Sequence, residues 1–175
     1  MTASGPVIVL TGPPAAGKSV VGKLLAGQLG AALVDTDAEV EAVAGKPVGD
    51  IFVEDGEPAF RELERAAARR ALAADGAVVA LGSGAVLDPD IRQSLTGQRV
   101  AYLAAGFTAI VRRLGLDRPH VVIPGNPRGR LRSMLEERQP VYERLAVITV
   151  QADELAPEEI ADEIAGWLAA EGPAR

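Results

Sequence analysis

The chain has 175 residues, of which 48% are hydrophobic and 24% are charged; this composition indicates one folded domain rather than a disordered segment. It contains no cysteine and one histidine, which excludes disulfide scaffolds, thiol chemistry and histidine-rich metal sites. The formal net charge is −6. Residues 151–175 hold seven acids and one base, so residues 1–150 are electrically balanced.

No apolar run is long enough to span a membrane, and the first residues lack the basic and apolar regions of a signal peptide. We therefore expect a cytoplasmic protein that does not bind a membrane. Residues 112–138 contain seven arginines and three acids. The chain has only six aromatic residues to stack on bases, so this positive charge predicts a small anionic ligand rather than a nucleic acid.

Short β-branched runs alternate with longer amphipathic runs, which is typical of a parallel sheet with helical crossovers. We expect strands at residues 7–10, 32–34, 77–81, 99–103 and 147–150. We expect helices at residues 19–29, from Asp55-Gly56-Glu57 to about 74, after residue 103 to about 114, and at 131–145 and 157–169. Residues 115–130 contain three prolines and three glycines between two helices, which predicts a lid loop. No linker divides the chain, so residues 1–175 are expected to form a single domain.

A glycine-rich motif lies between the first expected strand and the first expected helix. It reads Gly12-Pro13-Pro14-Ala15-Ala16-Gly17-Lys18-Ser19 and fits the P-loop pattern G-x-x-x-x-G-K-[ST]. The composition of the chain would produce about 0.002 such matches by chance. We predict that this loop and Val20 bind ATP, with Lys18 on the outer phosphates and Ser19 on Mg²⁺.

The kind of P-loop protein follows by exclusion. Lys23 and Lys46 do not stand in the Asn-Lys-x-Asp element with which GTPases recognise guanine. Motors and helicases need a longer chain. A small ATP-dependent kinase remains.

Two acids follow the second expected strand, at the edge of the sheet where α/β folds bind ligands. In an extended segment Asp35 and Asp37 point the same way, so both carboxylates can face one site. We predict that Asp35 holds Mg²⁺ through water and that Asp37 accepts the proton of the substrate hydroxyl. The alternative is that one or both cap a helix that starts near Ala38.

Several groups of residues resemble the shikimate kinase family in order and spacing. They are Asp35-Thr36-Asp37, Asp50-Ile51-Phe52 with Asp55-Gly56-Glu57 and Phe60-Arg61, Leu81-Gly82-Ser83-Gly84-Ala85-Val86, Arg118-Pro119 and Arg138-x-Pro140-x-Tyr142. The resemblance covers about residues 7–170. It implies transfer of the γ-phosphate of ATP to the 3-hydroxyl of shikimate, which gives shikimate 3-phosphate on the route to chorismate and the aromatic amino acids.

The resemblance also implies a monomer with a three-layer α/β P-loop kinase fold. In this fold helices flank a five-stranded parallel sheet, with a substrate-binding helical segment at about residues 36–64 and a lid at about 115–130.

Roles for single residues come from the same resemblance. Asp37 contacts the accepting hydroxyl and acts in catalysis together with Lys18 and Arg118. Arg61 and Arg138 clamp the shikimate carboxylate beside the turn Gly82-Ser83-Gly84, Arg118 reaches the phosphates from the lid, and Arg113 stacks on adenine. A planar carboxylate also matches guanidinium forks on chemical grounds. The alternative for Arg61 is an ion pair with Glu57 or Glu64 on its own helix.

The chain departs from the family pattern at a few positions. Ser83 stands where the family usually has a third glycine, and its Cβ would be strained if the backbone needed a positive φ. Ala15-Ala16 replace Gly-Ser, which costs little if both residues stay helical or extended. His120 replaces an aliphatic residue and is expected to be partly exposed in the lid.

Two other functions remain open from the sequence. One is a sibling kinase that acts on gluconate or another polyhydroxy acid. The other is a catalytically weak sensor that binds ATP and a ligand to regulate a partner.

Overall fold

The computed structural model describes residues 5–118 and 125–172. Within them, one sheet of five parallel strands has the order β2-β3-β1-β4-β5. The strands are β1 (Ile8–Thr11), β2 (Leu33–Asp35), β3 (Val78–Ala80), β4 (Val100–Ala104) and β5 (Ile148–Gln151). The predicted fold class is confirmed, and each strand boundary lies one residue from its predicted position.

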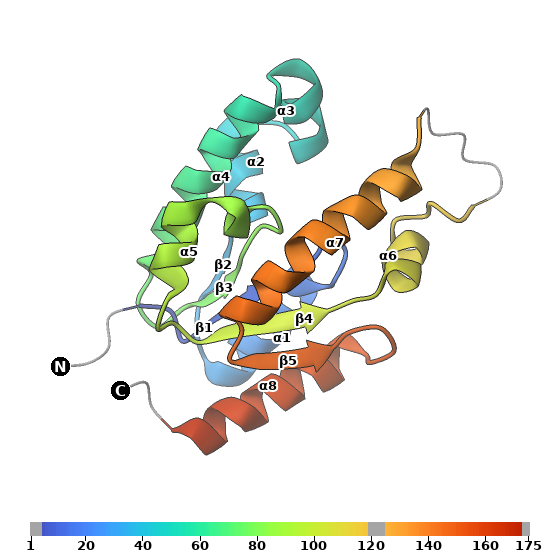
Figure 1. Cartoon of the computed structure of the whole chain (residues 1–175). Helices are drawn as coiled ribbons and strands as arrows, with labels where there is room; N and C mark the ends of the chain where they lie inside the picture. Colours follow the sequence, from blue (N-terminus) through green and yellow to red (C-terminus); the bar gives the residue numbers. More distant parts are fainter. Residues whose placement is uncertain (1–4, 119–124, 173–175) are drawn as a thin grey trace.

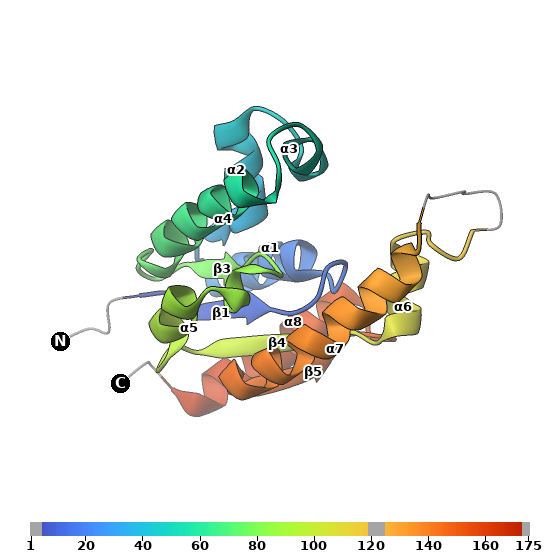
Figure 2. The same cartoon turned by 45° about the horizontal axis from the view of Figure 1, so that its top comes forward.

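Helices cover both faces of the sheet and form three layers (Figures 1 and 2). The first face packs against α1 (Lys18–Leu29) and α8 (Pro157–Glu171), and the second packs against α4 (Glu57–Leu72), α5 (Pro89–Leu95) and α7 (Pro127–Leu145). Successive strand residues alternate between the two layers, as the pleat requires. Ile8 and Leu10 enter the core beneath α1 and α8, whereas Val9 enters the core beneath α4, α5 and α7.

Three helices form an arm beyond the carboxyl end of β2: α2 (Thr36–Ala44), α3 (Val48–Glu54) and the first turns of α4. Figure 2 shows α2 and α3 raised above the sheet. The arm has a small core of its own, made of Val40, Ile51, Phe60 and Ala67. Because α4 continues from this core onto the sheet, the arm is fixed at its base while α3 lies at its tip.

Some elements differ from the predicted ones. The lid loop was predicted to reach residue 130, but α7 begins at Pro127, where Asn126 caps the helix by accepting a hydrogen bond from the Gly129 N–H at 2.9 Å. His120 lies outside the described residues. The helix before the lid is α6 (Phe107–Arg113). The short helices η1 (Ala85–Leu87) and α5 were not predicted. No helix in the described ranges is long and apolar enough to cross a membrane.

Candidate active site

The phosphate loop leaves the carboxyl end of β1 and leads directly into α1. A Cβ atom at Gly12 would lie 2.6 Å from the Leu103 carbonyl oxygen, and the φ of Gly12 is +147°. Gly17 has a φ of +97° immediately before α1 begins. Both positions therefore require glycine, the first for space and the second for backbone conformation. The loop presents the N-terminus of α1, where free N–H groups favour bound phosphate.

Ala15 has a left-handed backbone, with a φ of +59°. The condition under which this replacement would cost little, a helical or extended backbone, is therefore not met at Ala15. This conformation costs an L-residue about 1–2 kcal/mol. Neighbouring contacts hold it in place, since the Ala15 carbonyl accepts a hydrogen bond from Nη1 of Arg113 at 3.1 Å.

Arg113 connects the phosphate loop to the loop after β5. Besides Ala15, its guanidinium donates to the carbonyl of Ala152 and, at 3.3 Å, to that of Asp153. The predicted adenine-stacking residue therefore lies beside the phosphate loop. Its guanidinium is bonded to backbone carbonyls of that loop and of the loop after β5.

Lys18 lies folded along the loop and is 9% exposed. Its Nζ donates to the carbonyls of Gly12 and Pro13, each at 2.9 Å. Burial lowers the pKa of Lys18 to about 8, and the nearby carboxylates of Asp37 and Asp35 oppose this shift. The first turn of α1 also holds Ser19 and Val20, which are both exposed. The loop therefore has a cation that phosphate oxygens can recruit and a hydroxyl that solvent can reach.

The two acids after β2 have different surroundings. Asp35 ends β2 and caps α2, because its Oδ1 accepts hydrogen bonds from the N–H groups of Asp37 at 3.1 Å and Ala38 at 3.3 Å. Asp37 lies in the first turn of α2, so the premise of an extended segment is wrong. The pKa of Asp37 is raised, chiefly because burial removes water from around its carboxylate. The charge of Lys18 opposes the rise.

The turn after β3 lies directly against Asp37. The buried Thr36 hydroxyl accepts a hydrogen bond from the Gly82 N–H at 2.8 Å, which joins this turn to the start of α2. A Cβ atom at Gly82 would lie 2.8 Å from Oδ1 of Asp37. Glycine therefore leaves the Asp37 carboxylate room beside the turn.

Arg61 on α4 faces the same turn. Its Nη1 donates to Oε2 of Glu64 at 2.7 Å, and its Nη2 donates to Oε1 of Glu57 at 3.2 Å. A Cβ atom at Gly84 would lie 2.1 Å from Nη1 of Arg61. Both ion pairs considered for Arg61 are present, and they hold the guanidinium against Gly84.

Arg138 reaches the turn from α7 and is 8% exposed. Its Nη1 donates to Oγ of Ser83 at 3.3 Å, and one turn along α7 the Tyr142 hydroxyl donates to the Ser83 carbonyl at 2.7 Å. The Nε of Arg138 is buried without a hydrogen-bond partner among the described residues. Ser83 has no positive φ, so the anticipated strain is absent and its hydroxyl contacts Arg138 instead.

Comparisons with known proteins agree with this arrangement. The family model for shikimate kinase matches residues 14–169. The chain belongs to the shikimate kinase family. A curated shikimate kinase of Thermobifida fusca (strain YX) is 52% identical, with 97% of this chain and 98% of that protein covered. A solved shikimate kinase from Acinetobacter baumannii, in complex with shikimate, has a TM-score of 0.85 and 30% identity, with 95% of this chain and 94% of that chain covered.

Family membership makes this chain an ATP-using kinase and confirms the predicted enzyme class. The fold is also shared more widely. A gluconokinase from Sinorhizobium meliloti has a TM-score of 0.62 and 21% identity, with 98% of this chain and 95% of that chain covered. At this identity the likeness concerns the fold alone.

Glu64 is a site residue that the sequence suggested only as an ion-pair partner. It is 4% exposed, and its Oε1 would lie 3.1 Å from a Cβ at Gly82 and 3.2 Å from one at Gly84. Burial raises the pKa of Glu64, and Arg61 opposes the rise. Glu64 falls on the buried stripe of α4 between Phe60 and Ala67. An acid on an apolar stripe was the available signal, since buried acids are almost always paired.

Arg118 is the predicted site residue that the structure leaves apart. It is exposed beyond α6, and its guanidinium lies near Gly115, 3.6 Å from the position that a Cβ there would occupy. The acceptor side of α7 borders an open cavity of about 630 Å³ lined by Arg130, Ser133 and Arg138.

Proposed function

We propose that the chain transfers the γ-phosphate of ATP to the 3-hydroxyl of shikimate, which gives ADP and shikimate 3-phosphate. The convergence of Asp37, Arg61 and Arg138 on the turn at residues 82–84 carries this proposal. Asp37 is also close enough to Lys18 to influence its pKa. This arrangement sets a base and two guanidinium groups beside a phosphate loop, as a kinase with an anionic acceptor requires.

The acceptor carboxylate is proposed to bind between the guanidinium groups of Arg61 and Arg138. Glu64 holds Arg61 from one side by a 2.7 Å hydrogen bond. The buried Nε of Arg138 lacks a partner in the described structure and can donate to an incoming anion. Charge-assisted bonds from two arginines fix the ring, so that its hydroxyl faces Asp37.

Asp37 is proposed to take the proton of the hydroxyl while that oxygen attacks the γ-phosphorus. The bond between the γ-phosphorus and the oxygen that bridges to the β-phosphate breaks, and ADP leaves with that oxygen. Lys18 exchanges its two loop carbonyls for phosphate oxygens and compensates their charge. Negative phosphate also raises the pKa of Lys18 and keeps it protonated.

The proposed nucleotide contacts are residues 12–20 and Arg113, with Arg118 added from the lid at residues 115–126 as it closes. Ser19 and Asp35 fit a Mg²⁺ ion, because a hydroxyl and a carboxylate are oxygen ligands of the kind this ion prefers. No group of three or more candidate ligands gathers elsewhere in the described ranges. When bound there, such an ion would supply positive charge that partly neutralises the phosphates.

Further proposals concern the protein as a whole. We propose a single domain over residues 1–175, with an acceptor-binding segment at about residues 36–64. A cytoplasmic monomer that binds neither membranes nor nucleic acids is consistent with the composition and with the few aromatic side chains.

A coupled assay of ADP release tests the proposed reaction with shikimate, quinate and gluconate as acceptors. We expect kcat/KM to be highest for shikimate by at least about a hundredfold. Equal or greater activity with gluconate would contradict the proposal and favour a sibling kinase. Binding of ATP and shikimate without ADP release would favour a sensor.

A further inference from the structure

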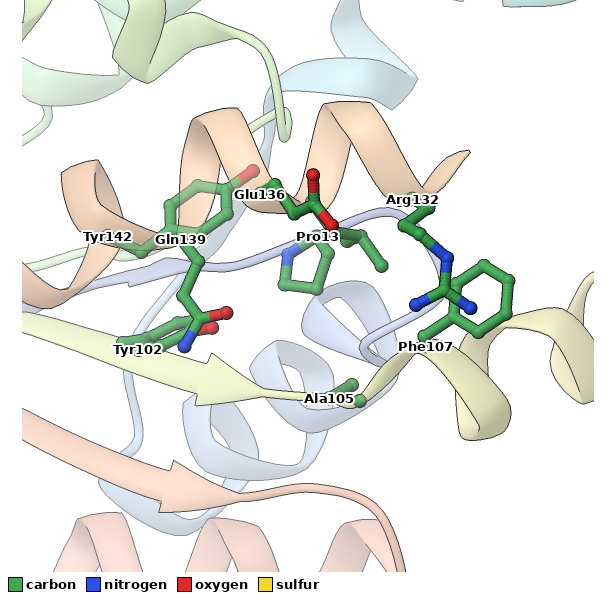
Figure 3. Close-up of a pocket in the computed structure, with 10 residues that line it drawn as sticks. Pro13, Tyr102, Ala105, Phe107, Arg132, Glu136, Gln139 and Tyr142 are labelled. Carbon is green, nitrogen blue, oxygen red and sulfur yellow. The ribbon is translucent and has the colours of Figure 1, made fainter. Parts of the chain in front are cut away.

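A second cavity, of about 200 Å³, lies between α7, the end of β4, the start of α6 and Pro13 of the phosphate loop (Figure 3). Arg132, Glu136 and Tyr142 line it from α7, whereas Arg130, Ser133 and Arg138 line the cavity of about 630 Å³ instead. The second cavity contains none of the proposed acceptor residues. It shares only Pro13 with the proposed nucleotide residues.

Aromatic side chains form much of the cavity wall. The rings of Tyr102 on β4 and Tyr142 on α7 are stacked, with centroids 5.3 Å apart. Figure 3 shows Pro13 between these tyrosines and Phe107, which begins α6. A cavity of about 150 Å³ is enough to hold benzene, and aromatic walls favour a flat ring by offset or edge contacts. The space therefore suits one aromatic ring with a short polar extension.

Two opposite charges stand at the mouth of this cavity without pairing. Arg132 and Glu136 are one helical turn apart, where such side chains commonly form an ion pair. The Arg132 guanidinium instead lies 4.2 Å from the centroid of the Phe107 ring. Glu136 has no cationic partner among the described residues, and both side chains are exposed. A cation-binding group and an anion-binding group are thus available side by side.

A proline adds a third polar group at the same turn. Pro140 lies inside α7 and has no N–H, so the Glu136 carbonyl lacks the donor that residue 140 would otherwise supply. The carboxylate of Glu136 provides acceptors for an ammonium group.

We propose that this cavity is a second ligand site for a small aromatic zwitterion, a molecule with one ring and adjacent ammonium and carboxylate groups. The ring packs among Pro13, Tyr102 and Tyr142. The ammonium group bonds to Glu136, and the carboxylate bonds to Arg132.

Occupancy of this site slows turnover, because two of its wall residues are hydrogen-bonded to the two halves of the proposed active site. The Pro13 carbonyl accepts a hydrogen bond from Lys18, and the Tyr142 hydroxyl donates to the Ser83 carbonyl in the acceptor turn. A ligand that bridges α6 and α7 also restrains the two helices that flank the lid. Inhibition should therefore persist at saturating ATP and saturating shikimate.

A titration followed by NMR chemical shifts, with ADP at saturation, tests binding directly. L-phenylalanine serves as the probe. The controls are 3-phenylpropionate, which lacks the ammonium group, 2-phenylethylamine, which lacks the carboxylate, and L-leucine, which lacks the ring. We expect phenylalanine to bind at about millimolar concentration, the range for a ligand of this size, and at least about fivefold more tightly than each control.

Two variants test which residue binds the ammonium group of the ligand and which binds its carboxylate. In Glu136→Gln, phenylalanine should bind no more tightly than 3-phenylpropionate; in Arg132→Gln, it should bind no more tightly than 2-phenylethylamine. Glu163→Gln makes the same chemical change on an exposed position of α8 and should bind phenylalanine like the unaltered protein.

The proposal is overturned if phenylalanine does not bind while ADP is at saturation, if it binds no better than leucine, or if neither charge variant alters its binding. The kinetic part has its own readout: phenylalanine should lower kcat in the unaltered protein and in Glu163→Gln, but not in Glu136→Gln. Binding without any effect on kcat would contradict the coupling to turnover. None of these variants alters a proposed catalytic residue, so failure here is separable from failure of the proposed reaction.

Discussion

Gly84 and Arg61 occupy adjoining space so closely that a Cβ atom on the glycine would lie 2.1 Å from Nη1 of the arginine. The side chain that meets this position is the end of a flexible arginine, so it can move aside without unfolding the chain. The glycine thus sets where the guanidinium lies, and Glu64 holds it there from the other side.

Gly84→Ala tests this relationship. We expect the KM for shikimate to rise about ten- to a hundredfold, the loss for one charge-assisted hydrogen bond, while the KM for ATP stays within about twofold. Gly27→Ala is the matched control, because nothing lies within 4 Å of a Cβ at that helical position. An unchanged KM for shikimate in Gly84→Ala would contradict the placement of Arg61 in the acceptor site.

Asp37→Asn and Arg138→Gln should affect different kinetic constants. Asparagine keeps the size of Asp37 but loses its basicity, so kcat should fall by at least about a hundredfold with little change in KM. Arg138→Gln should chiefly raise the KM for shikimate, because it removes a contact made before the reaction as well as during it. Steady-state kinetics with both substrates varied measure this contrast. If Asp37 were only a helix-capping or surface acid, Asp37→Asn would retain most of its kcat.

The pH profile of kcat/KM should have two limbs. Activity requires ionised Asp37, whose pKa is raised, so the acid limb should lie above the ordinary aspartate range. It also requires protonated Lys18, whose pKa is about 8 in the free protein, so kcat/KM should fall above that pH. Bound triphosphate raises the pKa of Lys18, and the alkaline limb of kcat at saturating ATP should therefore move to higher pH. A kcat/KM that stays constant from about pH 7 to pH 10 would rule out this role for Lys18.

Protonation of Lys18, which activity requires, should lower the free energy of unfolding. Its pKa in the folded state lies below that of an unfolded lysine, so the unfolded chain binds this proton more tightly. The resulting penalty on the fold is present below about pH 8 and disappears as the pH rises toward about 10.4, the value for a free lysine. Comparison of the unaltered protein with Lys18→Met by chemical denaturation across this pH range isolates the effect.

Ala15→Gly should stabilise the protein slightly. Glycine removes the cost of a φ of +59° but gives the unfolded chain more freedom, so the net gain should be at most about 1 kcal/mol. Ala16→Gly is the control, since Ala16 is buried and has no positive φ, and it should destabilise the protein. Equal losses in unfolding free energy for both variants would show that the Ala15 conformation carries no strain.

Much of the fold could be predicted from local patterns, because buried parallel strands are short β-branched runs. The phosphate loop could also be predicted, since glycine and lysine are required there at fixed spacing. The conformation of Ala15 could not be predicted, because the loop is held by contacts such as the bond from Arg113, between residues 98 positions apart. Glu64 was underrated for a similar reason. The periodicity of α4 places Glu64 on the buried stripe, but it does not reveal that the carboxylate lies against the turn at residues 82–84.

The alternative that one of the two acids caps a helix is confirmed for Asp35, but which of them would do so was beyond the local pattern. Both follow a strand, but the chain turns into α2 at Thr36, so one carboxylate becomes a cap and the other enters the site. The Thr36 hydroxyl fixes this difference through its bond with Gly82, 46 positions away.

The central claim is that Arg61 and Arg138 together grip the carboxylate of the acceptor. The most direct measurement compares kcat/KM for shikimate and for its analogue with the carboxylate reduced to an alcohol, in the unaltered protein and in Arg138→Gln. Loss of charge-assisted bonds to two arginines predicts that the unaltered protein prefers shikimate by at least about a hundredfold, and that Arg138→Gln loses most of this preference. Equal use of both acceptors by the unaltered protein would contradict the account.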